Sequence, residues 1–504
     1  MRFARFSPSA RAAGSRPAAR VALALLLWPL VTMAETPQPG PALAEYFRQC
    51  HAVQVCNGSF LVMRGEQVLY EGALGDAVAE GGQGLTPAHA FDIGSITKQF
   101  TAAAIVRLAE QGRLGLDDPA AKHLPGFPYP DVTVRQLLTH TSGVPDVMPY
   151  YSKVLRGGEV TTPITTEDAV QILTGQKMQP VFAPGTRFEY SNTGYLLLAR
   201  IVTRASGVDY ARYLDREFFT PLGMSHTRVR MPDNEAGIDP RAYGFRVSAS
   251  GRRQAFDQVP QFYVAGAGGI YSTARDLYRW ARALRGGKLM SAEHWTEATT
   301  PVRLADGGSV PYGFGLALRP SSLGQARVSH GGHWRGFKAD LTLLPAQDLD
   351  IVLLTNNGED DSVDHARDAV EAIVAGKPHT PMKASIHVPL FQRLQSDDAD
   401  ALRKWLAGER AASPARYDFL EDKVNELGYA LIERKEFDKA VAVMEFNRDA
   451  HPQSLNVYDS LADAYLARGD REAAIAQARR MIELKPDSKQ AQEKLKTLQA
   501  SPQP

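Results

Sequence analysis

The sequence has little net charge, few cysteines and only one long apolar run. Its 57 Lys and Arg residues against 56 Asp and Glu residues leave a net charge of +1 over 504 residues. Proteins that bind nucleic acid need a basic surface, so this balance predicts that nucleic acid is not a partner. With 44% hydrophobic and 22% charged residues, the chain is typical of a globular protein of roughly two to four domains.

The one long apolar run lies near the start of the chain. Residues 21–31 are apolar, Ala34 follows them, and five arginines precede them: Arg2, Arg5, Arg11, Arg16 and Arg20. A basic start, a short apolar core and a small residue are typical of a signal peptide, here cut after Ala34. We therefore expect residues 1–34 to direct export and the mature protein to be periplasmic or secreted. The membrane is a partner only if this segment is retained as an anchor.

Cys50 and Cys56 are the only cysteines. In an exported chain, two cysteines this close together favour a small disulfide over two free thiols. A metal site is disfavoured because, apart from His51, no cysteine or histidine lies near this pair at the spacing of metal ligands. We expect the bridge to staple the segment that enters the first strand, without a catalytic part.

Strand-like segments occur at both ends of the region 35–376, and helical segments lie between them. The expected strands are 58–64, 67–72, 312–318, 326–329, 337–344 and 349–354, and a helix over 364–374 closes the region. Strands from distant parts of the chain with helices inserted between them predict an α/β sandwich whose sheet is largely antiparallel.

The glycine-rich run Ala265-Gly266-Ala267-Gly268-Gly269 lacks the spacing of a dinucleotide-binding loop and a preceding βαβ pattern. We expect a tight turn before a helix over 272–284. The sequence therefore predicts no cofactor and no metal.

The C-terminal residues 413–504 follow a linker predicted over 377–412 and show a repeat. Pairs of similar residues lie 34 positions apart: Pro452 and Pro486, Ala440 and Ala474, Leu427 and Leu461, and Leu431 and Tyr465. This period resembles tetratricopeptide helix pairs. The expected helices are 418–433, 437–449, 454–467, 471–484 and a capping helix 487–499. An unrelated helical bundle is the alternative.

The catalytic signal begins at Ser95 and Lys98, which precede an Ala-rich segment. A serine and a lysine three apart at the start of a helix lie on one face, so the amine can reach the hydroxyl. Alone, this pattern is expected about once by chance in a chain of this length. Tyr190 adds a phenol able to relay a proton, and Asn192 adds an amide able to contact both a lysine and a substrate carbonyl.

A third group of residues follows a β-rich segment. His330 can donate a hydrogen bond or a proton, and Gly331 and Gly332 let substrate approach a strand edge closely. Each candidate also has a structural interpretation: Ser95 as a helix cap, Tyr190 as a core aromatic and His330 as a turn histidine. His140, in the turn 139–143, is expected to be structural.

The three motifs in this order resemble the serine β-lactamase and penicillin-binding-protein superfamily: Ser95-x-x-Lys98, Tyr190-x-Asn192 and His330-x-Gly332. The resemblance is to the class C-like branch, which includes serine D-Ala-D-Ala peptidases and carboxylesterases. It extends over residues 42–375 and implies a β-lactamase-like α/β fold, an antiparallel sheet flanked by helices with a helical subdomain.

The resemblance implies a role for each matching residue. Ser95 would form an acyl-enzyme, Lys98 and Tyr190 would share general-base and general-acid duties, and Asn192 would orient Lys98 and substrate. The backbone N–H groups of Ser95 and His333 would form the oxyanion hole.

His330 departs from the pattern, because it replaces the lysine that opens the third motif in typical β-lactamases. Recognition of an anionic carboxylate is therefore less expected, unless Arg335 substitutes for that lysine. The sequence thus predicts a serine hydrolase for ester or amide substrates, including D-amino-acid peptides, more than a β-lactamase. The alternative is a catalytically idle penicillin-recognition fold that docks a protein partner through its helical repeats.

Overall fold

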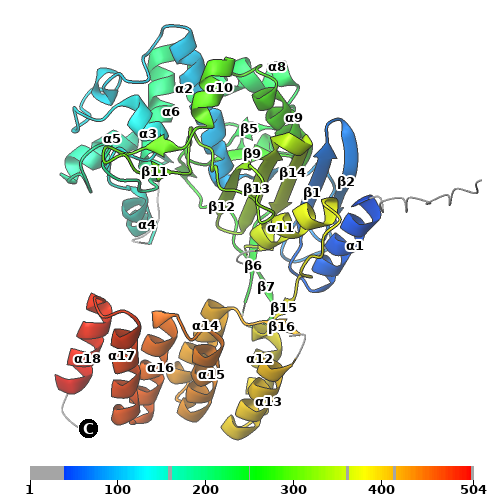
Figure 1. Cartoon of the computed structure of the whole chain (residues 1–504), viewed down its shortest axis with the longest axis vertical. Helices are drawn as coiled ribbons and strands as arrows, with labels where there is room; N and C mark the ends of the chain where they lie inside the picture. Colours follow the sequence, from blue (N-terminus) through cyan, green and yellow to red (C-terminus); the bar gives the residue numbers. More distant parts are fainter. Residues whose placement is uncertain (1–38, 157–161, 249, 359–361, 413–415, 501–504) are drawn as a thin grey trace, which may run out of the picture. The chain divides into compact units, whose positions relative to one another are not determined.

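The computed structural model describes residues 39–156, 162–248, 250–358, 362–412 and 416–500 (Figure 1). The predicted signal peptide, residues 1–34, lies outside the described residues. No helix within the described ranges has the length and apolar character needed to span a bilayer.

The main sheet has five strands in the order β12-β13-β14-β1-β2, and every neighbouring pair is antiparallel. The strands are β1 (Gly58–Arg64), β2 (Gln67–Leu74), β12 (Val328–Trp334), β13 (Phe337–Leu344) and β14 (Leu349–Thr355). Gly58 of β1 pairs with Thr355 of β14, so the two ends of the region meet in one sheet. The predicted antiparallel sheet built from distant segments is confirmed.

Helices cover both faces of this sheet, as Figure 1 shows. On one face, α1 (Pro39–Ala52) packs against β2, and α11 (Ser362–Val374) packs against β13 and β14. On the other face, α9 (Ala274–Arg285) packs against β14 and β1. Each face buries its own apolar cluster. Because β13 is covered on both sides, all eight of its residues are buried, including the polar Lys338, Asp340 and Thr342 that alternate with its apolar residues.

The helical subdomain lies in the chain between β2 and β12. Its helices are α2 (Thr97–Glu110), α3 (Val134–Leu138), α4 (Met148–Arg156), α5 (Asp168–Gly175), α6 (Asn192–Ser206), α7 (Tyr210–Leu214), α8 (Thr220–Leu222) and α10 (Ala292–Ala298). A small antiparallel sheet combines β3 (Phe91–Asp92), β9 (Ile270–Ser272) and β5 (Arg228–Val229). The packing of α2 on α6 brings the first two sequence motifs together.

Short two-stranded pairs complete the strands: β4 (Ile164–Thr165) with β8 (Phe262–Tyr263), β6 (Phe245–Val247) with β7 (Arg253–Ala255), β10 (Val302–Arg303) with β11 (Ser309–Val310), and β15 (Ala384–Ser385) with β16 (Tyr417–Asp418).

The predicted strand 312–318 is wrong. This segment makes only isolated bridges, between Tyr312 and Ala317 and between Ala317 and Ser329. The Gly313 N–H donates to the Leu316 carbonyl at 2.8 Å, so the segment turns back on itself instead of extending. Apolar composition alone did not reveal this turn.

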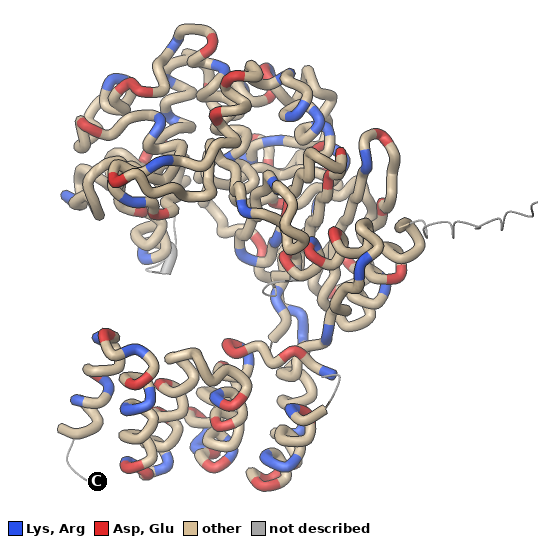
Figure 2. Tube along the Cα trace, viewed as in Figure 1, with Lys and Arg blue, Asp and Glu red and all other residues tan. Residues whose placement is uncertain are grey.

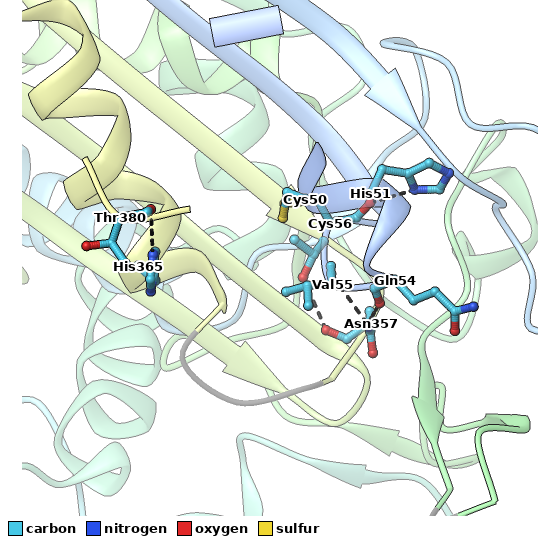
Figure 3. The surroundings of a disulfide bond; sticks show 9 residues. Cys50, His51, Gln54, Val55, Cys56, Asn357, His365 and Thr380 are labelled. Carbon is cyan, nitrogen blue, oxygen red and sulfur yellow. Dashed lines mark hydrogen bonds between the residues drawn. A yellow bond between two sulfur atoms is a disulfide. The ribbon is translucent and has the colours of Figure 1, made fainter. Parts of the chain in front are cut away.

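Cys50 and Cys56 form the predicted disulfide, at the end of α1 (Figure 3). Both residues are buried, and beside them the His51 Nδ1 lies 2.9 Å from the Cys56 carbonyl oxygen. The bridge closes the turn between α1 and β1, as expected.

The C-terminal residues form consecutive helices close to the predicted ranges. They are α14 (Glu421–Glu433), α15 (Phe437–Ala450), α16 (Leu455–Arg468), α17 (Arg471–Leu484) and α18 (Lys489–Ala500). Each helix packs on the next. Gly428 on α14 faces Met444 on α15, where an added Cβ would lie 2.6 Å from the Met444 Cε. The helices are thus shown, and their tetratricopeptide nature stays a prediction.

The segment 377–412 differs from the linker that was predicted, because it contains α12 (His387–Leu394) and α13 (Ala399–Ala411). Leucines four residues apart on both helices are buried in one apolar cluster with residues of α14, α15 and α16: Leu390 and Leu394 on α12, and Leu402 and Leu406 on α13. Burial of this stripe gives the segment a fixed helical structure.

Lysine and arginine alternate with aspartate and glutamate along the trace (Figure 2). Many of them form ion pairs, such as Arg367 with Asp340 at 3.2 Å and Arg327 with Glu371 at 3.2 Å. This interspersed pattern accords with the near-neutral net charge, and the absence of a nucleic-acid partner stays a prediction.

Candidate active site

Ser95 lies in a tight turn that joins the small sheet to α2. The turn is one 3-10 segment, η1 (Gly94–Ile96), between β3 and the first residue of α2. The Asp92 carboxylate accepts the Gly94 N–H at 2.8 Å and so fixes the turn. Ser95 is half-buried and lines a cavity, whereas its neighbours Gly94 and Ile96 are buried. The hydroxyl is therefore presented to the cavity at the N-terminal side of a helix.

Lys98 lies one turn further on, fully buried, and its amine contacts three oxygen atoms. The Nζ atom is 2.9 Å from each of the Ser95 hydroxyl, the Asn192 amide oxygen and the Ala267 backbone carbonyl. The last two can only accept hydrogen bonds, so they take two of the N–H groups. The remaining direction of the amine points at Ser95.

The protonation state of Lys98 decides whether its amine presents an N–H group or a lone pair to the Ser95 hydroxyl. Burial lowers its pKa to about 7, against a smaller opposing effect of the Asp146 charge. In the neutral amine a lone pair points at Ser95, and it can accept the proton of the Ser95 hydroxyl. Near neutral pH a large fraction of Lys98 is thus a base aimed at the nucleophile.

Tyr190 and Asn192 stand at the start of α6. The Lys98 Nζ lies 4.7 Å from the centroid of the Tyr190 ring, and the phenol hydrogen-bonds with Ser95. Burial of the hydroxyl raises the pKa of Tyr190 above its usual value, and the hydrogen bond from Ser95 opposes this only in part. Although 40% of the residue surface is exposed, the phenol is therefore neutral, and it is suited to donate a proton.

Asp146 supports this arrangement and was not identified from the sequence. Its carboxylate accepts the Asn192 N–H at 3.3 Å, the Thr193 hydroxyl at 3.3 Å and the Met148 N–H at 2.9 Å. It thereby caps α6 and places a negative charge near Lys98. The only sequence signal was an aspartate after a Gly-Val-Pro turn, which is common in ordinary loops.

Strand β12 lies directly against the nucleophile turn. A Cβ added to Gly332 would lie 2.0 Å from the Ile93 carbonyl oxygen, and one added to Gly94, whose φ is +50°, would lie 2.6 Å from the His333 nitrogen. Only glycine permits this approach on both sides. The backbone nitrogen of His333 thus lies beside the turn that holds Ser95, and the oxyanion hole formed by these two N–H groups stays a prediction.

His330 lies behind this edge with 6% of its surface exposed. Its Nε2 is 3.0 Å from the Tyr312 hydroxyl and its Nδ1 is 2.7 Å from the Gly331 carbonyl oxygen. Burial and the Lys98 charge lower the pKa of His330 to about 4. The ring is therefore neutral at physiological pH, and both nitrogens have partners within the protein.

The cavity beside Ser95 has a volume of about 190 Å³. Its apolar lining comes from Met148, Leu196, Phe262, Val264 and Trp334, and its polar lining includes Ser95, Tyr190, Asn192, His333, Asp92, Arg230 and Gln258. The rings of Phe262 and Trp334 stack with their centroids 5.4 Å apart. The cavity suits a small acyl group with an apolar or aromatic side chain.

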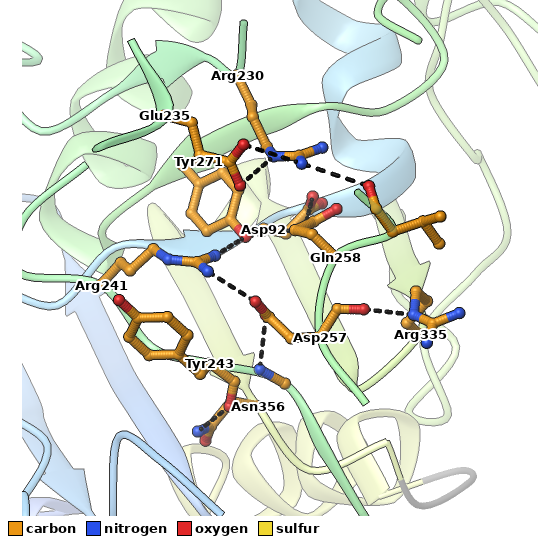
Figure 4. Close-up of polar contacts among 12 residues, drawn as sticks. Asp92, Arg230, Glu235, Arg241, Tyr243, Asp257, Gln258, Tyr271, Arg335 and Asn356 are labelled. Atoms are coloured by element: carbon orange, nitrogen blue, oxygen red, sulfur yellow. Dashed lines mark hydrogen bonds and ion pairs between the residues drawn. The ribbon is translucent and has the colours of Figure 1, made fainter. Parts of the chain in front are cut away.

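Hydrogen bonds lock the polar wall of the cavity (Figure 4). Gln258 donates to Asp92 and to the Tyr271 hydroxyl, both at 2.8 Å, and accepts from the Trp334 indole at 2.8 Å. Burial raises the pKa of Asp92 to about 6. Arg230 is held by Glu235 at 3.0 Å and by the Phe262 carbonyl at 2.7 Å.

Arg335 does not replace the lysine of the third motif. Its guanidinium donates to the Asp257 carbonyl and lies 4.2 Å from the centroid of the Phe256 ring (Figure 4). It is not among the residues that line the cavity. The suggestion that Arg335 binds a substrate carboxylate is therefore not supported by its position.

The structure thus gathers all the site residues that the sequence predicts. Ser95, Tyr190, Asn192 and His333 line the cavity, Lys98 and His330 lie behind it, and Gly332 permits the close approach of β12. Their individual roles stay predictions. Within the described ranges, no cluster of three or more His, Cys, Asp or Glu side chains is arranged to hold a metal.

Comparisons with known proteins agree with this geometry. The Beta-lactamase family model matches residues 43–375. A penicillin-binding protein of Bacillus subtilis (strain 168) is 34% identical over 334 residues, which are 64% of this chain and 73% of that protein. A D-aminopeptidase of Gluconobacter oxydans (strain 621H) is 27% identical over 335 residues, 65% of this chain and 60% of that protein.

Solved structures extend the agreement to three dimensions. The octameric penicillin-binding protein homologue from Pyrococcus abyssi superposes with a TM-score of 0.59 and 27% identity, and the match spans 71% of this chain and 82% of that one. Through its residues 43–375, the chain belongs to the beta-lactamase family of serine hydrolases.

Proposed function

We propose that the protein hydrolyses esters or amides, including D-amino-acid peptides, through an acyl-enzyme on Ser95. One observation carries the proposal: the Lys98 Nζ lies 2.9 Å from the Ser95 hydroxyl while two obligate acceptors take its other N–H groups. A buried amine with a pKa of about 7 is matched to proton abstraction near neutral pH.

The first half of the reaction forms the acyl-enzyme. The Ser95 oxygen bonds to the substrate carbonyl carbon, and its proton passes to the Lys98 amine. The backbone N–H groups of Ser95 and His333 stabilise the negative charge on the carbonyl oxygen. Collapse of the intermediate breaks the bond to the leaving group, which takes a proton from Tyr190, and Lys98 returns a proton to the phenol.

The second half releases the acid. A water molecule attacks the ester carbon after giving its proton to the neutral Lys98 amine, and the Ser95 oxygen leaves with that proton. Because the same base serves both halves, loss of Lys98 is expected to block acylation and deacylation alike.

The cavity chemistry favours neutral or aminated substrates over free carboxylates. Arg230 is committed to Glu235, and His330 is neutral in the place where typical β-lactamases carry lysine. The similarity to a D-aminopeptidase, at 27% identity, supports amide substrates with a free amino group. We therefore propose a carboxylesterase or D-amino-acid peptidase, with β-lactam hydrolysis the less favoured activity.

Location and partners belong to the same proposal. The Cys50–Cys56 disulfide supports a periplasmic or secreted protein, since such bridges persist in oxidising compartments. The helices α14 to α18 are proposed to form tetratricopeptide-like repeats that bind a protein partner. The idle binding protein, the alternative, is disfavoured because the nucleophile and its base are in contact.

The test is hydrolysis by the purified protein of p-nitrophenyl esters, nitrocefin and D-Ala-D-Ala peptides, together with fluorophosphonate labelling. Ser95→Ala is expected to abolish turnover and labelling. Ser225→Ala is the control, because this exposed serine lies 3.1 Å from a different basic side chain, the His226 ring, and does not line the cavity. Undiminished labelling of the Ser95→Ala protein would refute the proposal.

A further inference from the structure

A chain of hydrogen bonds runs beneath the site and links two of its motifs. It begins at the Ser191 N–H, which donates to His140 Nδ1 at 3.2 Å. It continues from His140 Nε2 to the Tyr312 hydroxyl at 3.2 Å, then to His330 Nε2 at 3.0 Å. It ends where His330 Nδ1 meets the Gly331 carbonyl at 2.7 Å.

The two backbone ends determine the direction of every bond. A backbone N–H only donates, so His140 Nδ1 carries no proton and Nε2–H donates to Tyr312 in the neutral ring. A backbone carbonyl only accepts, so His330 Nδ1 carries the proton and Nε2 accepts from the Tyr312 O–H. From either end, the Tyr312 hydroxyl therefore accepts from His140 Nε2–H and donates to His330 Nε2.

All three side chains are enclosed. His140 is 2% exposed and Tyr312 and His330 are each 6% exposed. The Tyr195 hydroxyl donates to the Leu138 carbonyl at 2.7 Å, and its oxygen accepts from the Gly315 N–H and is also within hydrogen-bonding reach of Tyr312. Tyr195 is therefore paired without the Tyr312 proton, whereas His330 Nε2 would have no donor if that proton went to Tyr195. Buried polar groups that are fully paired hold one conformation, since any rearrangement would leave a donor or acceptor without a partner.

The chain of hydrogen bonds connects the segment that carries the proton donor Tyr190 with strand β12, which lies against the nucleophile turn. At one end, the His140 ring lies 4.3 Å from the Tyr190 ring, measured between centroids, and its Nδ1 holds the backbone next to Tyr190. At the other end, His330 and Gly331 belong to β12, whose Gly332 touches the nucleophile turn.

We propose that Tyr312 and His140 are positioning residues of the reaction, which fix His330 as a neutral hydrogen-bond acceptor and hold β12 in register with the Tyr190 segment. On this proposal His330 does not donate a proton to substrate; its Nε2 is occupied by Tyr312. The proposal rests on the proposed hydrolase function for its kinetic consequence, but the tautomers themselves do not depend on it.

The first test reads the tautomers without substrate. In the full-length protein labelled with ¹⁵N-histidine, His330 is expected to be protonated at Nδ1 and His140 at Nε2 at neutral pH. His330→Asn and His140→Asn variants assign the signals. A His330 ring protonated at Nε2, or charged, would overturn the proposal even if the protein hydrolyses no ester.

The second test uses Tyr312→Phe, which removes the hydroxyl and keeps the ring. Its kcat on the best ester is expected to fall about tenfold with KM changed less than about twofold, because the two buried hydrogen bonds with His140 and His330 that orient the site are lost. Tyr129→Phe is the control, since this buried tyrosine loses a hydrogen bond outside the site, to the Met178 carbonyl at 2.8 Å. An equal fall in the control would mean a general structural effect and would overturn the proposal.

A double-mutant cycle then asks whether Tyr312 acts through His330. In the His330→Ala background, Tyr312→Phe is expected to change kcat by less than about twofold, because the hydrogen bond that links Tyr312 to β12 is already missing and only the one with His140 is left. Additive losses would show that the two residues act separately and would refute the positioning role. Failure of the hydrolase proposal itself gives a different result: the wild-type and Ser95→Ala proteins would hydrolyse the esters at the same rate.

Discussion

The Nζ atom of Lys98 lies 2.9 Å from the Ser95 hydroxyl, and the lysine side chain is completely buried. The amine is therefore held where its neutral form is favoured and where its lone pair meets the nucleophile. Asp146 opposes the burial effect in part, since its charge raises the pKa of Lys98.

The pH dependence of hydrolysis should follow Lys98. Since the base is active when neutral, kcat/KM should rise with pH through about 7, the pKa of Lys98. Asp146→Asn removes the charge that raises this pKa, so the rising limb of the kcat/KM profile should move to lower pH by roughly half a unit to one unit. Asp209→Asn, at the cap of α7, is the control and should leave the limb unchanged. A shift to higher pH would contradict the assignment of Lys98.

Gly332→Ala should separate β12 from the nucleophile turn. The new Cβ would lie 2.0 Å from the Ile93 carbonyl oxygen, so the strand must move, and unfolding free energy should fall by roughly 2 kcal/mol or more. Gly331→Ala is the adjacent control, because its Cβ would lie 3.7 Å from the nearest atom, the Ala339 carbonyl oxygen. Denaturant unfolding and kcat of both variants test this, and equal effects would argue against the close approach.

Trp334 should limit the size of the acyl group. Its ring stacks on Phe262 at one wall of the cavity, so Trp334→Ala should raise the ratio of kcat/KM for p-nitrophenyl octanoate over acetate by about tenfold. Trp405→Ala, in α13, should leave the ratio unchanged. If Trp334→Ala lowers both rates equally, the wall supports the fold but does not select substrate.

The disulfide should stabilise the fold without affecting catalysis. The bridge joins residues six positions apart, and closing so short a loop is worth about 2 kcal/mol. The Cys50→Ser, Cys56→Ser double variant should unfold at lower temperature, with kcat unchanged, because neither cysteine lines the cavity. Wild-type protein should lose the same stability in reductant, and a reductant-insensitive melting curve would contradict this.

The sequence predicted the parts of the fold that depend on local pattern. The hairpin of β1 and β2, the strands β13 and β14, and the helices α14 to α18 follow from alternation, from 34-residue spacing and from turn residues. The segment 312–318 was predicted wrongly, since its apolar residues pack around a turn. The helices of 387–411 were missed as well, because their burial depends on partners further along the chain.

By itself, the sequence determined the reacting groups. A serine and a lysine three residues apart at the start of a helix lie on one face, so the amine can reach the hydroxyl. The order of three motifs then identified the family, and the disulfide followed from two nearby cysteines in a chain expected to be exported.

Only the tertiary structure decided the state of those groups. Burial lowers the pKa of Lys98 to about 7, and the acceptor role of His330 results from Tyr312 and from His140, which lies far away in the sequence. Solvent exclusion and long-range hydrogen bonds set protonation, and neither can be inferred from the identity of a residue or from its neighbours in the chain.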